Sequence, residues 1–290
     1  SIRRQRQMCI RDRMYRVSKV LNNNGVIAID MDENKEYVIL GKGVGFGKKV
    51  SQRFDKPEGC TTYRLEQETE RGSAKELVKG IEPEYLEIAD AILTESQKVF
   101  GDSIDRGILF PLADHISFAV ARIRRNEQIS NPLTEDIKVL FYSEFKVAET
   151  LKTILRERLQ IEIDDHEVGY VALHIHSAIG DEKVSVAMQT ARAVRECIDM
   201  LEKATGKPID VLSLSYNRLM NHMKYMVARA STGEKLNLDM NEYMLDQYPQ
   251  AYKVATDICK NLEGCIGHKL DETETGYLAM HIQRVYKDAV

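Results

Sequence analysis

The sequence predicts a multidomain chain in which a small antiparallel β-sheet domain precedes two homologous all-α helical-bundle domains. Two observations support this fold class. Residues 15–54 consist of short β-branched runs separated by Asn, Asp and Gly clusters, which is typical of an antiparallel meander. From Ile81 onward the apolar residues recur at helical spacing, and several blocks occur twice at one fixed separation. With 290 residues, the chain is long enough for two or three domains with proper cores.

The first domain is expected to contain three strands before a glycine-rich segment. YRVSKVL is followed by the turn-like NNNG, VIAIDM by the polar DENK, and YVILG by GKGVGFGKKV. The last segment has a glycine at every second position from Gly41 to Gly47. The pattern changes after about Phe54, so we expect the domain boundary in the polar stretch from about Asp55 to Gly80.

The helical part contains an internal repeat with an offset of 107 residues. Three blocks show it: DHISFAVAR and NHMKYMVAR, FKVA and YKVA, and ALHI and AMHI. The first and third blocks share a histidine, which pairs His115 with His222 and His174 with His281. One offset across three separate blocks indicates two homologous helical domains.

These patterns divide the chain into a first domain with its linker at 14–71 and helical domains at 72–178 and 179–290. Residues 1–13, SIRRQRQMCIRDR, have no apolar period and end just before Met14, so we expect a non-native leader there. The net charge of −4 is uneven, because residues 1–55 carry +6 and the rest of the chain carries −10. A basic front suggests that a polyanion binds near the N-terminus.

Composition argues against several classes of protein. No stretch approaches the roughly 18 consecutive apolar residues of a membrane span, so no membrane insertion is expected. The five cysteines are odd in number and include no C-x-x-C pair, which fits reduced thiols. We therefore expect a cytoplasmic protein.

The H-x-H pair of His174 and His176 is a candidate metal site, but helix geometry argues against it. Residues i and i+2 of a helix do not face each other, and the second copy has Gln283 where the first has His176. Close Cys or carboxylate partners typical of zinc are lacking, as are the nucleophile motif G-x-S-x-G and the metalloprotease motif H-E-x-x-H. We therefore expect no metal, no cofactor and no catalytic residue, and do not expect an enzyme.

The repeated histidines are expected to lie at the edges of apolar helix stripes, where an imidazole can reach solvent or a partner. A neutral imidazole is nucleophilic near pH 7 and can accept a phosphoryl group, with which an arginine would pair. A duplicated core would also repeat, so a purely structural role stays open. Both members of the first pair are followed by an aromatic residue at i+3 and an arginine at i+7, namely Phe118 and Arg122, and Tyr225 and Arg229.

The segment from Gly41 to Gly47 lacks the closing G-K-[ST] of a P-loop and the spacing of a dinucleotide fingerprint. By itself it is a flexible loop. Beside the Asn22–Asn24 run and nearby lysines, however, it also fits RNA binding. Glycines allow close backbone approach, phenylalanine stacks on a base, asparagine amides read base edges and lysines contact phosphates. RNA is favoured over duplex DNA because no helix of this domain could enter a major groove.

Together these motifs resemble those of the BglG/SacY-type transcriptional antiterminators, from Met14 to the end of the chain. KVLNNNGVIAI with GKGVGFGKK resembles the family's RNA-binding domain, and DHI, ALHI, NHM and AMHI resemble its paired phosphotransferase-regulated domains. GKGVGFGKK and ALHIHSA are most similar to the branch that controls glucose-permease operons. The resemblance implies a four-stranded β domain that dimerises and binds an RNA hairpin in a nascent transcript, which prevents a terminator from forming.

The resemblance also implies regulation by the sugar phosphotransferase system, through a phosphocarrier protein and a sugar permease. Lys42 stands where relatives frequently have arginine, and Asn221 replaces the aspartate that precedes His115. The implied phospho-acceptors are His115, His174, His222 and His281. The positions expected to contact RNA are Lys19, Asn22, Asn24, Gly41, Lys42, Gly43 and Phe46.

Two other functions are compatible with parts of the sequence. A DNA-binding transcriptional activator could have the same regulatory domains, but it would need a helix-turn-helix or an ATPase module at the N-terminus. A histidine-rich metalloenzyme would need bound metal that depends on His174 and His281.

Overall fold

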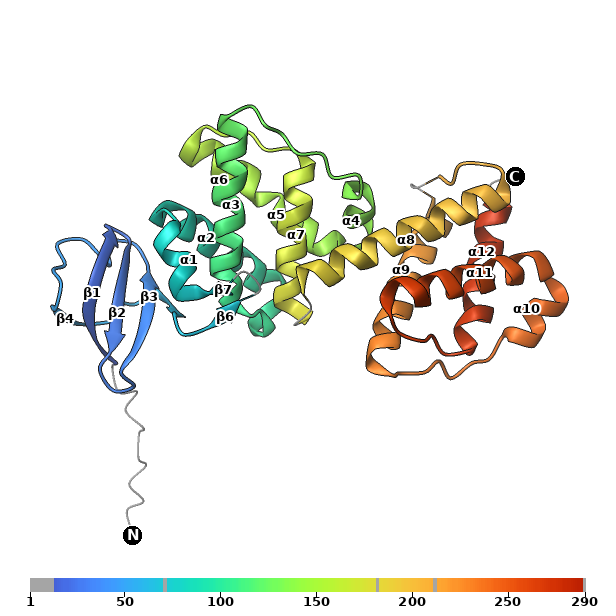
Figure 1. Ribbon diagram of the computed structural model, residues 1–290, viewed down its shortest axis with the longest axis horizontal. Coiled ribbons are helices and arrows are strands. Elements are labelled where there is room, and N and C mark those ends of the chain that lie inside the picture. The colour runs from blue at the N-terminus through green and yellow to red at the C-terminus, as the bar shows by residue number, and fades with distance from the viewer. Residues whose placement is uncertain (1–12, 70–71, 181–182, 211–212, 289–290) are drawn as a thin grey trace, which may run out of the picture. The chain divides into compact units, whose positions relative to one another are not determined.

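The computed structural model describes residues 13–69, 72–180, 183–210 and 213–288 (Figure 1). Residues 1–12 of the expected leader lie outside the described residues. Contacts divide the chain into two compact units, one of Ser1–Gln128 with Thr150–Glu162 and the other of Ile129–Glu149 with Ile163–Val290. The division runs through the first helical repeat, because α4, α5 and α7 of that repeat contact one another and the helices of the second.

Within the described residues, the N-terminal domain is a five-stranded antiparallel sheet in the order β4-β1-β2-β3-β5. The first three strands are those that the β-branched runs predict. The resemblance implied four strands; here the short β4 pairs with β1 and β5 pairs with β3, which makes five. The strands are β1 (Met14–Asn22), β2 (Gly25–Asp30), β3 (Lys35–Leu40), β4 (Arg53–Asp55) and β5 (Thr61–Arg64).

Strands β1 and β2 form a tight hairpin, because only two residues separate the paired Asn22 and Gly25. One face of the sheet packs around Tyr15, whose ring centroid lies 6.3 Å from that of Tyr37 and 6.0 Å from that of Phe54. Residues two apart on β1 and β2 share this face, as the alternation in the sequence predicts. The core cluster comprises Tyr15, Val17, Val26, Ala28, Tyr37, Ile39, Val44, Phe54 and Cys60.

The polar stretch from Asp55 to Gly80 is more structured than its composition predicts. It contains β5, the two-residue strands β6 (Glu68–Thr69) and β7 (Gly72–Ser73), and helix α1 (Ala74–Gly80). Strand β3 is buried throughout Tyr37–Leu40, so both of its faces are covered. On β5, the Tyr63 hydroxyl donates to Asp90 and accepts a 2.8 Å hydrogen bond from Arg106. These contacts attach the sheet to the first helices.

The rest of the described chain is helical (Figure 1). Helix α2 begins at Pro83, as the Glu-Pro-Glu signal predicts, and left-handed glycines follow α8, α9 and α11. No helix within the described residues is both long and apolar enough to cross a membrane. The helices are α2 (Pro83–Phe100), α3 (Leu109–Arg124), α4 (Thr134–Leu140), α5 (Tyr142–Ala148), α6 (Thr150–Leu159), α7 (Asp165–Gly180), α8 (Val184–Thr205), α9 (Leu214–Thr232), α10 (Asn241–Gln247), α11 (Pro249–Ile266) and α12 (Thr273–Asp288).

The sequence repeat is also a repeat of structural elements. Shifting α4 by 107 residues gives the bounds of α10, and the same shift places α3 on α9 and α7 on α12 within two residues. Helix α11 covers the positions equivalent to both α5 and α6. The four repeated histidines therefore lie on two equivalent pairs of helices, α3 and α7 in the first copy and α9 and α12 in the second. This confirms two homologous helical domains.

The glycine of the repeated Gly-Tyr motif has different surroundings in the two copies. A Cβ at Gly276 would lie 2.7 Å from the backbone nitrogen of Asn241 and 2.7 Å from the carbonyl carbon of Met240. The Gly276 N–H also donates to Asn241 Oδ1 at 2.8 Å. A Cβ at Gly169 would meet only ordinary contacts, the nearest being Ile137 at 3.8 Å.

We predict opposite effects for the same substitution at these two glycines. Gly169→Ala should be neutral or stabilise by up to about 1 kcal/mol, because alanine favours the helix. Gly276→Ala should destabilise by about 1–3 kcal/mol, because two backbone segments must separate. Urea denaturation of both variants, read by circular dichroism, provides the measurement. Equal effects at the two sites would contradict the steric argument.

Candidate functional sites

The glycine-rich loop 41–47 is attached to the Asn22–Asn24 turn by backbone groups. The N–H groups of Gly41 and Gly45 donate to the carbonyl oxygens of Asn24 at 2.9 Å and Asn23 at 3.0 Å. The Gly43 N–H donates to Asn24 Oδ1 at 2.9 Å. The loop and the β1–β2 turn therefore form one surface.

Close approach explains why two positions of the loop are glycine. A Cβ at Gly45 would lie 2.0 Å from the Asn22 carbonyl oxygen, and a Cβ at Gly41 would lie 2.3 Å from the Cys60 sulfur. Gly43 instead has a φ of 74°, which glycine adopts without strain. The alternating glycines thus serve packing and backbone conformation.

The structure joins four of the seven residues expected to contact RNA by hydrogen bonds: Asn22, Asn24, Gly41 and Gly43. The other three, Lys19, Lys42 and Phe46, have exposed side chains that make no hydrogen bond or ion pair within the described residues. Phe46 is 73% exposed, which is unusual for a phenylalanine. An exposed aromatic ring beside free ammonium groups suits stacking on a base and contact with phosphates.

Sequence reasoning missed Glu87, a residue of α2 that contacts this surface. Asn22 Nδ2 donates to Glu87 Oε1 at 2.7 Å, and Asn24 Nδ2 donates to Glu87 Oε2 at 3.2 Å. Arg158 Nη1 lies 3.5 Å from the same Oε2. No local pattern around Glu87 predicts this contact, because it depends on how α2 packs against the sheet.

His222 of α9 and His281 of α12 stack against each other in the second helical domain. Their ring centroids are 4.7 Å apart at an interplanar angle of 25°, and the Tyr277 ring lies 5.4 Å from His222. His222 is only 8% exposed. Its Nε2 and Nδ1 of His281 are buried without a hydrogen-bond partner among the described residues. Unsatisfied buried nitrogens are rare and often mark a site of chemistry.

A buried ion pair lies next to the two rings. Arg229 donates from Nε to Glu274 Oε1 at 2.6 Å and from Nη2 to Oε2 at 2.9 Å. His222 Nε2 lies 3.7 Å from the same Oε2. The planar guanidinium matches the carboxylate with two parallel bonds, which is also how arginine binds a phosphoryl group.

Both rings are neutral at physiological pH. Burial, together with the positive charges of His281 and Arg229, lowers the pKa of His222 to about 3. Burial, with Arg284 and Arg218, lowers the pKa of His281 to about 4. A neutral imidazole has a free lone pair on one nitrogen and is therefore nucleophilic.

The first helical domain also buries its repeated histidines. His115 on α3 is 8% exposed and His174 on α7 is 6% exposed. The expectation that the edge histidines reach solvent is therefore wrong for His115, His174 and His222. Helical periodicity identifies the most apolar face, but helices packed on several sides also cover the edge of that face.

His176 has a structural role. Its Nδ1 lies 2.9 Å from Glu144 Oε1, and its ring centroid is 4.3 Å from that of Phe141. Burial raises the pKa of Glu144, but hydrogen bonds from His176 and the backbone and the charge of Lys224 outweigh it, so the net shift is downward. The described residues contain no group of three or more His, Cys, Asp or Glu side chains that could hold a metal ion.

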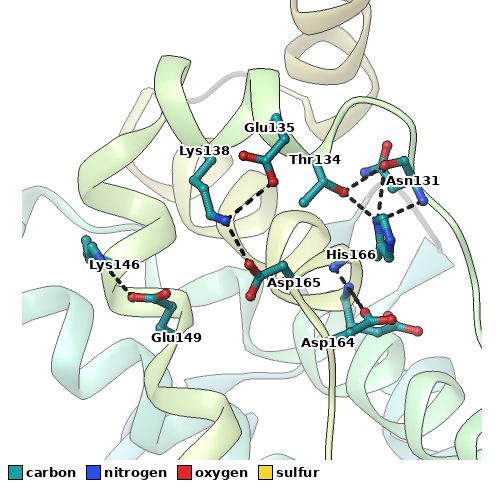
Figure 2. A network of polar contacts seen from close by, with 10 residues as sticks. Asn131, Thr134, Glu135, Lys138, Lys146, Glu149, Asp164, Asp165 and His166 are labelled. Carbon is teal, nitrogen blue, oxygen red and sulfur yellow. Dashed lines mark hydrogen bonds and ion pairs between the residues drawn. The ribbon is translucent and has the colours of Figure 1, made fainter. Parts of the chain in front are cut away.

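A network of polar contacts fixes the start of α7, the helix that contains His174 (Figure 2). Lys138 donates to Asp165 at 2.7 Å, and the hydroxyl of Thr134 lies 2.7 Å from His166 Nδ1. Asp164 accepts from the backbone N–H of His166 at 3.0 Å, which satisfies a free donor at the helix start. His166 is thus a structural histidine as well.

The repeat contains residues that sequence reasoning did not single out. Asp164 and Asp271 both precede the Gly-Tyr motif, and each accepts backbone N–H groups at the start of its helix. Glu167 and Glu274 stand seven residues before His174 and His281, again 107 apart. The offset alone could have identified Glu274.

Comparison with known proteins agrees with this arrangement. The profile of the CAT RNA-binding domain matches residues 15–72, and that of the PRD domain matches residues 90–178 and 194–285. The GlcA/glcB genes antiterminator of Staphylococcus carnosus is 30% identical over 274 residues, covering 92% of this chain and 94% of that one. The chain belongs to the family of CAT–PRD transcription antiterminators.

Other members of the family align over nearly their whole length. Protein GlcT of Staphylococcus haemolyticus is 28% identical, covering 92% of this chain and 95% of that protein. Transcription antiterminator LicT of Bacillus subtilis is 27% identical, covering 94% of this chain and all of LicT. A crystal structure of GlcT CAT-PRDI matches with a TM-score of 0.50 and 29% identity, covering 58% of this chain and 99% of that one. These relatives confirm the family that the motifs predict, including its glucose-related branch.

The buried histidines make the stability of the second PRD depend on pH. The folded-state pKa values of about 3 and about 4 lie below the ordinary value of 6.5. Between these values the unfolded chain binds protons that the folded chain does not. We predict that the free energy of unfolding falls as the pH is lowered from about 6.5 towards 4, by about 1.4 kcal/mol per pH unit for each histidine.

Urea denaturation of the full chain at several pH values measures this slope. The doubly substituted variant His222→Gln, His281→Gln should lose most of it. Between pH 7 and 8 the two histidines should contribute no slope, which gives an internal control. An unchanged slope in the double variant would show that other groups cause the dependence.

Proposed function

We propose that the CAT domain binds an RNA hairpin in a nascent transcript, as a homodimer, and so prevents a terminator from forming. The observation that carries this proposal is the attachment of the glycine loop 41–47 to the Asn22–Asn24 turn, beside the exposed Lys42 and Phe46. The loop is held by its backbone, so its side chains are available to a ligand. The site of action is the cytoplasm, where nascent bacterial transcripts are made.

The proposed RNA surface consists of residues with distinct tasks. Lys19 and Lys42 contact phosphates, and Phe46 stacks on an unpaired base. The amide groups of Asn22 and Asn24 donate to RNA acceptors, while Gly41 and Gly43 let the backbone approach closely. Supporting this division, the three side chains assigned to phosphates and stacking are exposed and free of polar partners within the described residues.

Regulation is proposed to act through phosphorylation of His115, His174, His222 and His281 by a phosphocarrier protein and a sugar permease. A neutral ring nitrogen attacks the phosphorus of a phosphohistidine on the donor. The donor's N–P bond breaks, its imidazole leaves with the electron pair, and the acceptor ring loses its N–H proton to solvent. The chain receives phosphoryl groups and is proposed to catalyse no reaction of its own.

In the second PRD, a phosphoryl group would change the forces around the buried ion pair. The group carries a charge of about −1.5 to −2, which would repel the Glu274 carboxylate and attract Arg229. Since Arg229 is bonded to Glu274 through two hydrogen bonds, the phosphoryl group would compete for both. Buried rings also require α9 and α12 to separate before a donor can reach them. Phosphorylation is thereby coupled to a rearrangement of the domain.

Dimerisation is supported by large apolar side chains that are exposed in the single chain. Phe118 is 57% exposed and Tyr225 is 61% exposed, and each stands one turn after a repeated histidine. Exposed aromatic residues at equivalent positions of both PRDs suit a protein interface. A partner seated there would lie close to the helices that contain the phospho-acceptors.

The alternative of a DNA-binding activator lacks its structural requirement. Residues 13–69 contain strands and turns, with no helix that could enter a major groove. The N-terminal domain also matches the CAT RNA-binding profile.

We predict that Phe46→Ala weakens binding of the full chain to an RNA hairpin with partly mismatched stems by about 10- to 100-fold, because one base loses its stacking partner. Fluorescence anisotropy at fixed salt gives the Kd. Val50→Ala is the matched control, since Val50 is 65% exposed and is assigned no contact with RNA. Equal affinity of the two variants would remove Phe46 from the interface, and failure of the folded wild-type chain to bind any such hairpin would refute the proposed function.

Phosphoryl transfer can be mapped residue by residue. After incubation with the phosphorylated phosphocarrier protein and the permease, mass spectrometry is expected to find phosphate on His115, His174, His222 and His281. Substitution of each by Gln should remove that label. His176→Gln is the control and should keep the wild-type pattern, because His176 is bonded to Glu144. Phosphate on His176 in place of His174 would contradict the assignment.

A further inference from the structure

The carboxylate of Glu87 occupies both asparagines of the proposed RNA surface. Its Oε1 accepts from Asn22 Nδ2 at 2.7 Å, and its Oε2 accepts from Asn24 Nδ2 at 3.2 Å. One side chain of the first PRD region therefore takes a donor from each of the two residues at the tip of the β1–β2 hairpin. The contact joins the CAT domain to α2 within a single compact unit.

The orientation of both amides is fixed by the backbone. Asn22 Oδ1 accepts from the Asn24 N–H at 2.8 Å, and Asn24 Oδ1 accepts from the Gly43 N–H at 2.9 Å. Because backbone N–H groups can only donate, each amide oxygen points into the turn and each NH₂ group points outward. The two NH₂ groups are the parts of these side chains that a ligand can use, and Glu87 binds both.

Glu87 also has a second cationic neighbour. Arg158 of α6 lies 3.5 Å from Oε2, with its side chain 41% exposed, whereas the Glu87 side chain is 17% exposed. If the carboxylate left the asparagines, this guanidinium could pair with it without exposing an unpaired charge in a half-buried place. The geometry therefore provides both a bound and a released position for Glu87.

We propose that Glu87 competes with RNA for the amide groups of Asn22 and Asn24, and that RNA binding transfers the carboxylate to Arg158. The inference rests on the proposed function, in which these asparagines contact RNA. A phosphate or base carbonyl oxygen can occupy the place of a carboxylate oxygen, but both cannot be there together. The carboxylate also repels the phosphates of an approaching RNA.

The position of Glu87 gives the first helical domain a direct contact with the RNA surface. Helix α2 contains both Glu87 and Asp90, which accepts from the Tyr63 hydroxyl on β5. A movement of α2 relative to the sheet would change the hold of Glu87 on both amides at once. The free protein is thus in a state of reduced RNA affinity, which displacement of this single carboxylate relieves.

The experiment measures the Kd of the full chain for a fluorescent RNA hairpin with partly mismatched stems, at one salt concentration. Glu87→Gln should lower the Kd by about three- to tenfold, because a neutral amide competes less well for the donors. Glu87→Asp keeps the charge but is one methylene shorter, so it should lower the Kd as well. This second variant separates the contact from the general effect of removing a negative charge.

Two matched controls complete the test. Glu95→Gln removes the same charge from α2, but Glu95 pairs with Lys98 and should leave the Kd within about twofold. Arg158→Gln should raise the Kd more than Arg156→Gln does, because Arg156 pairs with Glu162. Circular dichroism checks that each variant is folded.

The outcomes are distinguishable. A lower Kd for both Glu87 variants but not for Glu95→Gln supports the inference. RNA binding that is equal in the wild type and the Glu87 variants, or weaker in those variants, overturns it and leaves the proposed function intact. Absence of RNA binding by the wild type and all variants overturns the proposed function and this inference together.

Discussion

Two imidazole rings stacked 4.7 Å apart inside a helical domain are compatible with folding only while both are neutral. A proton on either ring would place a positive charge in a buried site that already contains Arg229. The bidentate pairing of Arg229 with Glu274 satisfies that charge, and the helices around it can then close over the rings. Neutrality is also what makes an imidazole a nucleophile, so the condition that stabilises the fold prepares the residue for phosphorylation. A phosphoryl group removes neutrality and should therefore disturb the packing.

The CAT domain uses a different constraint, which is the anchoring of an irregular loop. Three backbone N–H groups of the glycine loop donate to the Asn22–Asn24 turn. The sheet below is closed on one face by aromatic packing around Tyr15 and is attached to α2 through Tyr63. Because Glu87 and Asp90 lie on the same helix, the sheet and its loop surface both depend on where α2 lies.

The sequence was most informative where the signal is local or repeated. Alternation predicted β1 to β3, and the offset of 107 residues predicted two copies whose helices coincide. Strand β5 escaped prediction because its stretch is polar and its one large buried residue, Tyr63, is stabilised by tertiary contacts. Histidine burial escaped as well, since periodicity does not reveal how many neighbours a helix has. Glu274 was within reach of the repeat argument, whereas Glu87 has no signal short of the packed structure.

The backbone anchoring of the glycine loop has a consequence for how such regulators diverge. The loop conformation depends on N–H groups and on small residues at Gly41 and Gly45, while Lys42 and Phe46 contribute nothing to it that the described contacts reveal. Side chains at those two positions can therefore change during evolution without refolding the domain. Paralogues in one cell could acquire separate transcript targets through a few substitutions, while the regulatory domains behind them stay the same.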